Sequence, residues 1–176
     1  MVTQYVRIPH ERIGVLIGHN GIVKEEIERK SASRISVDSE DGEVAIEGIE
    51  GGDQVKTLRV ADVIGAIGRG FSPEKAVTLM DDDLLLFEVI PLDHLTPKTL
   101  KRVKGRIIGE KGKTRRAIEN MTGAKISVYG KTVGLIGFSH QIKVAGDAIE
   151  MLIKGTPHST VYSFLERQRG VEVGEW

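Results

Sequence analysis

A stretch of 24 residues occurs twice in this chain, at a constant offset of 91 residues. Residues 14–37 match residues 105–128 without a gap, and nine of the positions are identical. The identities include a pair of glycines three residues apart, Gly18 and Gly21 in the first copy and Gly109 and Gly112 in the second. Chance does not bring two glycine pairs and an Ile-Ser-Val ending into one register. The chain is therefore a duplication, and we expect both copies to fold in the same way.

Each copy shows the same succession of strand and helix patterns. A β-prone stretch opens the copy, a short helical turn leads into Gly-x-x-Gly, and a helix with one apolar face follows. Two strands and a closing helix complete it, with Asp53 and Ser139 as the expected N-caps of the closing helices. The expected strands are Tyr5–Ile8, Arg34–Val37 and Val44–Ile46 in the first copy, and Leu84–Ile90, Lys125–Val128 and Val133–Ile136 in the second. We predict an α+β fold of order β-α-α-β-β-α, each copy a three-stranded antiparallel sheet with three helices on one face.

The copies divide the chain into four segments. We predict a first domain at 1–70, a short helical acidic linker at 71–83, a second domain at 84–155, and a C-terminal helix and tail at 156–176. Ser72 and Pro73 favour a helix start in the linker, and its apolar residues need burial. In the last segment we expect a helix that packs Val161, Phe164 and Leu165.

The charge of the chain is unevenly distributed. Its 25 basic and 25 acidic residues cancel, yet residues 92–155 carry 13 basic and 5 acidic groups, a net charge of +8. Residues 1–70 carry 9 basic and 12 acidic groups, a net charge of −3. Between Lys98 and Arg116 nine basic residues face Glu110 alone. A charge run by itself is often only a solvated face, so its meaning depends on the loop that it surrounds.

That loop is the Gly-x-x-Gly sequence, which stands between two helices in both copies. Glycine allows a positive φ and the close approach of another backbone. Because a helix begins directly after the loop, unpaired N–H groups and the positive end of the helix dipole point toward it. The sequence therefore predicts an anion site suited to a phosphodiester.

The second copy resembles the core of a type I KH domain almost throughout, in Gly105–Thr114, Ile118-Glu119 and Thr122–Val128. The first copy, with Gly18-His19-Asn20-Gly21, resembles it less closely. The resemblance implies that the loop clamps the backbone of single-stranded RNA. It also implies a groove with an apolar floor, for which Ile107, Ile108, Ile118 and Ile126 are candidates. We expect Ile118 and Ile126 to be mainly core residues, and Ile107 or Ile108 to be shared between core and groove.

A closer resemblance covers nearly the whole chain. The stretches Ala66–Ala76 and Gly155–Tyr162 are not part of a generic KH domain. Both are similar to the small-ribosomal-subunit assembly factors known as partner of Nob-one, in a compact archaeal form. This resemblance implies binding to the 3′ region of small-subunit ribosomal RNA during pre-rRNA processing. It implies a Nob-one-type endonuclease or a translation initiation factor subunit as protein partners, and a cytoplasmic location.

The residues expected to contact RNA are the loops, the basic side chains around the second loop and the two neighbouring isoleucines. They are Lys104, Arg106, Ile107, Ile108, Gly109, Glu110, Lys111, Gly112, Lys113, Arg115, Arg116, Lys125 and Lys131, with Gly18, His19, Asn20 and Gly21 in the first copy.

Two other classes of function compete with RNA binding. A metal-dependent nuclease would have to use Asp81-Asp82-Asp83, but adjacent side chains on an extended chain point apart and cannot all face one ion. The chain lacks cysteine, a nucleotide-binding motif, a membrane-spanning run and a signal-peptide pattern, so we expect no cofactor, no metal and no membrane. A protein-interaction scaffold with a single RNA-binding domain stays open, because the first copy is acidic at Lys24–Glu28 and Asp38–Asp41. We expect copy two to be the main RNA binder and copy one to be an auxiliary or partner-binding module.

Overall fold

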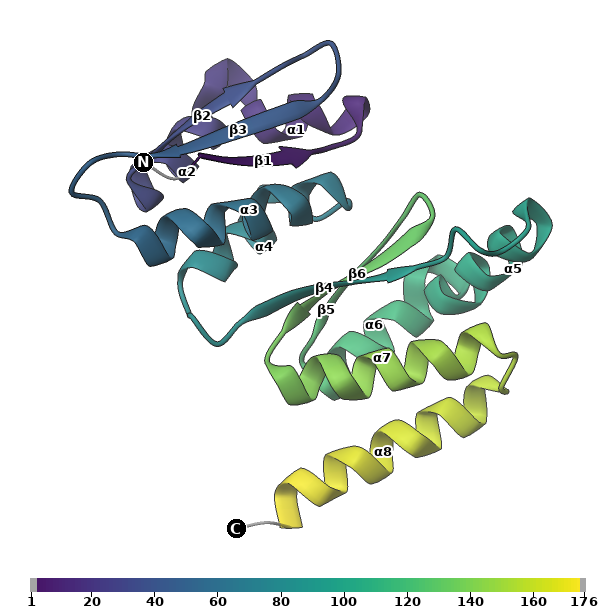
Figure 1. Ribbon diagram of the computed structural model, residues 1–176. Coiled ribbons are helices and arrows are strands. Elements are labelled where there is room, and N and C mark those ends of the chain that lie inside the picture. Colours follow the sequence, from purple (N-terminus) through teal and green to yellow (C-terminus); the bar gives the residue numbers. More distant parts are fainter. Residues whose placement is uncertain (1–2, 175–176) are drawn as a thin grey trace. The chain divides into compact units, whose positions relative to one another are not determined.

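The computed structural model describes the backbone of residues 3–174 and the side chains of residues 3–170 (Figure 1). It contains two compact units that divide between Asp83 and Leu84. Each unit has its own three-stranded sheet and its own buried core. This division places residues 71–83 in the first unit and residues 156–176 in the second.

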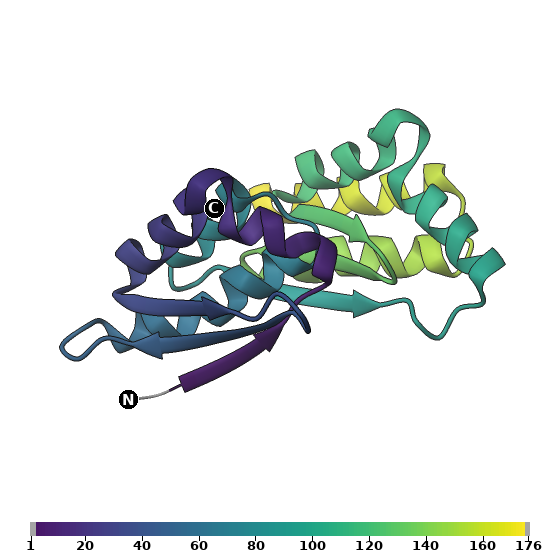
Figure 2. The same cartoon turned by 90° about the horizontal axis from the view of Figure 1, so that it is seen from above.

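In the first unit three strands pair in the order β1-β3-β2, and both pairings are antiparallel. Figure 2 shows α1 and α2 together on one side of these strands. Val44 and Ile46 of β3 are fully buried whereas Glu47 is exposed, so one face of the sheet is packed against helices. The elements are β1 (Thr3–Arg7), η1 (His10–Arg12), α1 (Ile13–Ile17), η2 (His19–Gly21), α2 (Ile22–Ser31), β2 (Ser33–Val37), β3 (Glu43–Gly48), α3 (Gln54–Gly68), α4 (Pro73–Ala76) and η3 (Val77–Met80).

The second unit repeats this arrangement, with strand order β4-β6-β5 and two antiparallel pairings. It adds a long C-terminal helix that packs on α6 and α7. The elements are β4 (Leu86–Pro91), α5 (Pro97–Ile108), η4 (Glu110–Gly112), α6 (Lys113–Thr122), β5 (Lys125–Tyr129), β6 (Thr132–Gly137), α7 (Ser139–Ile153) and α8 (His158–Gly174). The predicted α+β fold with two β-α-α-β-β-α units is confirmed.

Identical residues of the repeat occupy matching places in the two cores. Ile27 and Ile118 are completely buried, and Ile35 and Ile126 are each 2% exposed. These isoleucines join the helix after the loop to the neighbouring strand in both units. The repeat therefore preserves the packing that holds the loop, the helix and the strand together, and Ile118 and Ile126 are core residues as expected.

The segments that follow each closing helix are packed rather than free. Ser72 caps α4 by accepting a hydrogen bond from the Lys75 N–H, and Phe71 and Leu79 are buried beside α3. In α8 Val161 and Leu165 are buried in the core of the second unit. Apolar residues that the sequence placed outside the two repeats thus complete the two cores.

One predicted cap is wrong. Asp53 caps α3 as expected, because its carboxylate accepts from the N–H groups of Val55 and Lys56. In α7, however, the N-cap is Phe138 and Ser139 is the first helical residue. The side chain of Gln141 reaches back and accepts the Phe138 N–H at 2.9 Å, which starts the helix without a hydroxyl cap.

Candidate nucleic-acid interface

The two Gly-x-x-Gly loops have the same backbone conformation. The first glycines, Gly18 and Gly109, have φ of 75° and 73°, and the second glycines, Gly21 and Gly112, have φ of 78° and 76°. A Cβ on Gly109 would lie 2.8 Å from the main-chain nitrogen of Thr114, and one on Gly18 would lie 2.9 Å from that of Val23. Neither first glycine can carry a side chain, so both loops bring their backbone to the start of the next helix.

The residue before the second glycine distinguishes the loops. Asn20 and Lys111 occupy it with nearly equal φ of 53° and 52°. Asparagine visits this left-handed conformation readily, whereas a lysine there costs roughly 1 kcal/mol. Strain of this kind persists where the side chain serves a function. Lys111 is exposed at the loop, where its ammonium group can reach a phosphate held by the N–H groups of α6.

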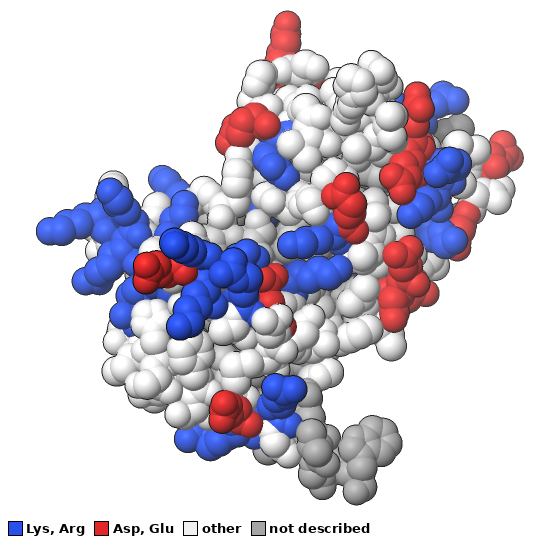
Figure 3. Space-filling view, turned by 180° about the vertical axis from the view of Figure 1, so that it is seen from behind, with Lys and Arg blue, Asp and Glu red and all other residues white. Residues whose placement is uncertain are grey.

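Basic side chains gather around the second loop. Figure 3 shows them as a broad blue patch on the left of that view, where α5 and α6 face the reader once Figure 1 is turned. Of the predicted contact residues, Lys113, Arg116 and Lys131 are exposed, as is Glu110, and Lys104, Arg115 and Lys125 are half-buried. The patch combines a positive field with a loop that exposes its backbone, which is an arrangement that attracts a phosphate chain.

Arg106, predicted to contact RNA, also has a structural role. Its guanidinium donates to the carbonyls of Leu152 and Thr156, at the end of α7 and just before α8. Its own carbonyl is bonded to Nε2 of His158 at 3.0 Å. Arg106 therefore ties α5 to the start of α8, and its contact with RNA stays a prediction.

The two isoleucines before the second loop, Ile107 and Ile108, differ in how far they are buried. Ile107 is completely buried in the core of the second unit, so it cannot touch a strand on the surface. Ile108 is half-buried directly before Gly109. Of this pair, Ile108 is the residue that can be shared between core and groove.

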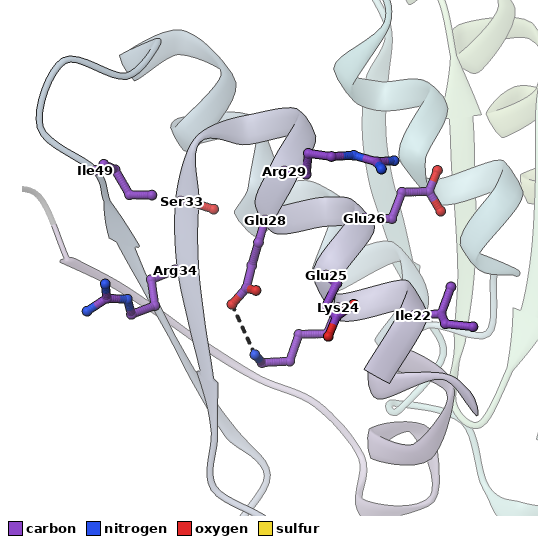
Figure 4. Close-up of a pocket in the computed structure, with 9 residues that line it drawn as sticks. All are labelled: Ile22, Lys24, Glu25, Glu26, Glu28, Arg29, Ser33, Arg34 and Ile49. Carbon is purple, nitrogen blue, oxygen red and sulfur yellow. Dashed lines mark hydrogen bonds and ion pairs between the residues drawn. The ribbon is translucent and has the colours of Figure 1, made fainter. Parts of the chain in front are cut away.

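In the first unit a groove of about 820 Å³ runs between α2 and β2 (Figure 4). Its charged lining is balanced, with three cations and three anions. The lining residues are Ile22, Lys24, Glu25, Glu26, Glu28, Arg29, Ser33, Arg34 and Ile49.

The offset of 91 residues assigns a counterpart in the second unit to each of these charged positions. Glu25 becomes Arg116, Glu26 becomes Ala117, and Arg29 becomes Asn120. The whole matched set in the second unit carries Lys113, Arg115, Arg116 and Lys125 against Glu119, a net charge of +3 where the first unit has zero. The same surface of the repeat is therefore neutral in one copy and cationic in the other.

A glutamate links helix and strand beside the groove in both units, a role that the sequence did not reveal. Glu28 accepts the Ile35 N–H at 2.8 Å and pairs with Lys24 at 3.0 Å. Glu119 accepts the Ile126 N–H at 3.1 Å and pairs with Arg115 at 2.6 Å. The identity of Glu28 and Glu119 in the repeat was the signal, since a charged residue kept in both copies beside a core isoleucine needs a partner.

The acidic and histidine side chains of the described residues bear on the metal-dependent nuclease alternative. Within this part of the chain no three His, Asp or Glu side chains lie together as a metal site would require, and this includes Asp81–Asp83. None of the helices that the structure describes is long and apolar enough to cross a membrane.

Comparison with known proteins places both units in one domain family. Residues 86–170 match the model of the eukaryotic type KH domain (KH-domain type I), and residues 3–65 match the model of the KH domain. KH domain-containing protein MJ0443 of Methanocaldococcus jannaschii is 42% identical over 169 residues, which cover 94% of this chain and 74% of that protein.

Two further matches connect the chain with ribosomal RNA. The pre-rRNA-processing protein PNO1 of Saccharomyces cerevisiae is 37% identical over 108 residues, which cover 60% of this chain and 39% of the yeast protein. A chain in the crystal structure of an a/eIF2alpha-aDim2p-rRNA complex from Pyrococcus horikoshii is 46% identical, with a TM-score of 0.91, and the match covers 96% of this chain and 94% of that one.

Proposed function

This chain belongs to the KH-domain family that includes archaeal Dim2p and the PNO1 pre-rRNA-processing proteins, and we propose that its second unit is the main binding site for single-stranded RNA. The observation that carries the proposal is a difference in charge, which is zero over the lining of the first unit's groove and +3 over the matching positions of the second unit. Because the loops share one backbone conformation, charge is what separates the two sites for a polyanion. The RNA is ribosomal, and its binding serves the processing of the small-subunit precursor.

The 3′ region of small-subunit ribosomal RNA is the proposed target, as the resemblance in sequence suggested. A single strand suits the loop, since its backbone is free to follow the glycines while its bases turn into the groove. The protein would then act where small subunits mature, in the cytoplasm.

The first unit is proposed as an auxiliary module that contacts protein. Its groove is neutral and the turn between β2 and β3 carries Asp38, Glu40 and Asp41, which repel phosphate. The Pyrococcus horikoshii complex contains a/eIF2alpha beside aDim2p and rRNA, which supports an initiation factor subunit as one partner. A Nob-one-type endonuclease is the other proposed partner.

The protein is proposed to bind RNA without cutting it. Highly purified protein incubated with single-stranded RNA, with and without Mg²⁺, should leave the RNA intact, because Asp81–Asp83 belong to no cluster of three metal-ligating side chains among the described residues. Cleavage that disappears when these three aspartates are changed to asparagine would contradict the proposal.

A further inference from the structure

On the matching surface of the second unit, Arg115 is fixed by an ion pair. Nη1 of Arg115 lies 2.6 Å from Oε1 of Glu119, and the two side chains are only 28% and 18% exposed. At its other end the guanidinium reaches the loop, since Nη2 lies 3.8 Å from the place of a Cβ on Gly112. The guanidinium of Arg115 therefore lies between the loop and Glu119.

Glu119 is itself fixed to the sheet. Its second oxygen, Oε2, accepts the main-chain N–H of Ile126 at 3.1 Å, and Ile126 is part of the core. Both oxygens of the carboxylate are thus engaged, one by β5 and one by Arg115. A guanidinium anchored in this way loses little side-chain entropy when a ligand arrives.

The neighbouring Arg116 is placed differently. Its Nη1 lies 3.6 Å from the same position at Gly112, but the side chain is exposed and the described residues provide it with no carboxylate. The pair of Arg115 and Glu119 is neutral, whereas Arg116 keeps its full charge for a phosphate. The two adjacent arginines at this loop therefore differ in exposure and in ion pairing.

We propose that Arg115 is a base-stacking platform beside the loop of the second unit, with Glu119 as the positioning residue that holds its guanidinium plane there. The inference rests on the proposed RNA binding by the second unit and adds the residue that receives a base. Unstacked bases bind on aromatic rings or on the plane of an arginine guanidinium. The offset of 91 gives no aromatic counterpart to the lining residues of α2 and β2 in the first groove.

The first unit has a similar anchor, in which Oε1 of Glu28 accepts from both Lys24 and the Ile35 N–H, but it has no arginine at this position. Lys24 takes the place of Arg115 and pairs with Glu28 at 3.0 Å, as the dashed line in Figure 4 shows. An ammonium group has no planar face, so a base cannot stack on it. The exchange of arginine for lysine between the copies therefore removes base binding at this point while the charge is conserved.

The test compares two RNA probes of equal charge. One is a fluorescein-labelled 12-residue oligoadenylate, and the other is a 12-residue ribose-phosphate strand without bases. The full-length protein is titrated with each probe, and the ratio of the two affinities measures what the bases contribute. Arg115→Lys should lower affinity for oligoadenylate by about five- to tenfold and leave affinity for the abasic strand unchanged, because stacking is lost but charge is not.

Two further variants make the assignment specific. Arg116→Lys is the matched control on the same helix, and it should leave the ratio of the two affinities unchanged. Glu119→Gln keeps an oxygen for the Ile126 N–H but frees Arg115, so it should raise affinity for the abasic strand and lower the ratio.

The outcomes separate the inference from the function on which it rests. If Arg115→Lys lowers the affinity for both probes equally, or leaves both affinities unchanged, Arg115 is not a stacking platform. An equal loss of the ratio in Arg116→Lys would also overturn the assignment. Wild-type protein that binds the abasic strand as well as oligoadenylate would refute base stacking and leave RNA binding in place, whereas failure to bind either probe would refute RNA binding itself.

Discussion

The two units of this protein share a backbone and differ in what they present on it. Their loops agree within a few degrees at both glycines, and the same isoleucines form the two cores. The matched groove positions nevertheless carry zero charge in the first unit and +3 in the second. The duplicated sequence kept the geometry that accepts a phosphate and changed the electrostatics that decide whether one is attracted.

In both units an arginine binds carbonyl groups at the end of the closing helix, but the two arginines come from different positions. In the first, Arg12 donates to the carbonyls of Ile67 and Phe71, which ties η1 to the end of α3 and the chain beyond. In the second, Arg106 does the same for the end of α7 and the chain beyond. The two arginines do not occupy matching positions at the offset of 91. Their hydrogen bonds are therefore not inherited from the repeat; they arise because the last carbonyls of a helix lack partners within the helix.

Reversing the charge at one matched position, Arg116 in the second unit or Glu25 in the first, should have the largest effect on RNA affinity. Arg116→Glu gives the second unit the charge that the first has at Glu25, and it should reduce RNA affinity by at least about tenfold because attraction to a phosphate becomes repulsion. The reciprocal Glu25→Arg should increase affinity. Titration of both variants with one single-stranded RNA at fixed salt measures this, and equal losses in the two variants would mean that groove charge does not separate the units.

Removing the glutamate beside the groove should destabilise both units alike. Glu28→Ala and Glu119→Ala each leave a strand N–H, that of Ile35 or of Ile126, without its acceptor, at a cost of about 1–3 kcal/mol. Urea unfolding followed by circular dichroism gives the change in the free energy of unfolding for each variant. A large cost in one unit and none in the other would show that the two hydrogen bonds, although alike in geometry, are not equivalent in energy.

Lys111, the non-glycine loop residue with positive φ, should lower the stability of the second unit while it increases RNA affinity. Lys111→Asn relieves the strain and should raise stability by about 0.5–1 kcal/mol, while RNA affinity falls by about threefold because one ammonium group no longer meets a phosphate. Asn20→Lys should show the opposite change in stability. Thermal unfolding of the two variants and the wild type measures the change in stability for each. A Lys111→Asn protein that is less stable than the wild type would contradict the claim that Lys111 is strained.

Sequence patterns were sufficient for what is local or repeated. Hydrophobic periodicity and the offset between the copies predicted all six strands and the helices around the loops, because each depends on neighbours in the chain. Burial followed as well for Ile118 and Ile126, whose register is the same in both copies. Asp53 was found as a cap because its hydrogen bonds reach only to Val55 and Lys56.

The rest depends on interactions between distant segments. The charge of Arg106 predicted a contact with phosphate but could not reveal its hydrogen bonds to carbonyls 46 and 50 residues away. Ile107 and Ile108 are adjacent in sequence and differ in burial only because α5 turns one of them toward the core. The partners of Glu119, and hence the fixed position of Arg115, likewise become visible only when β5 lies beside α6.

The central claim is that RNA affinity resides mainly in the second unit, and a matched pair of loop variants tests it most directly. One variant combines Glu110→Asp with Lys111→Asp, and the other combines His19→Asp with Asn20→Asp. All four glycines stay, and aspartate tolerates the left-handed conformation of the loop, so both proteins should keep their circular dichroism spectra. RNA affinity is then measured over a series of salt concentrations.

The second-unit variant should bind at least about tenfold more weakly, a decrease of roughly 1.4 kcal/mol in binding free energy. Its plot of log K against log salt should be less steep by about 0.7 for each phosphate that the protein no longer neutralises. The first-unit variant should weaken binding less and keep its slope, because its groove is already neutral. A greater decrease in affinity in the first-unit variant, with both proteins folded, would contradict the account and place the RNA chiefly on residues 3–70.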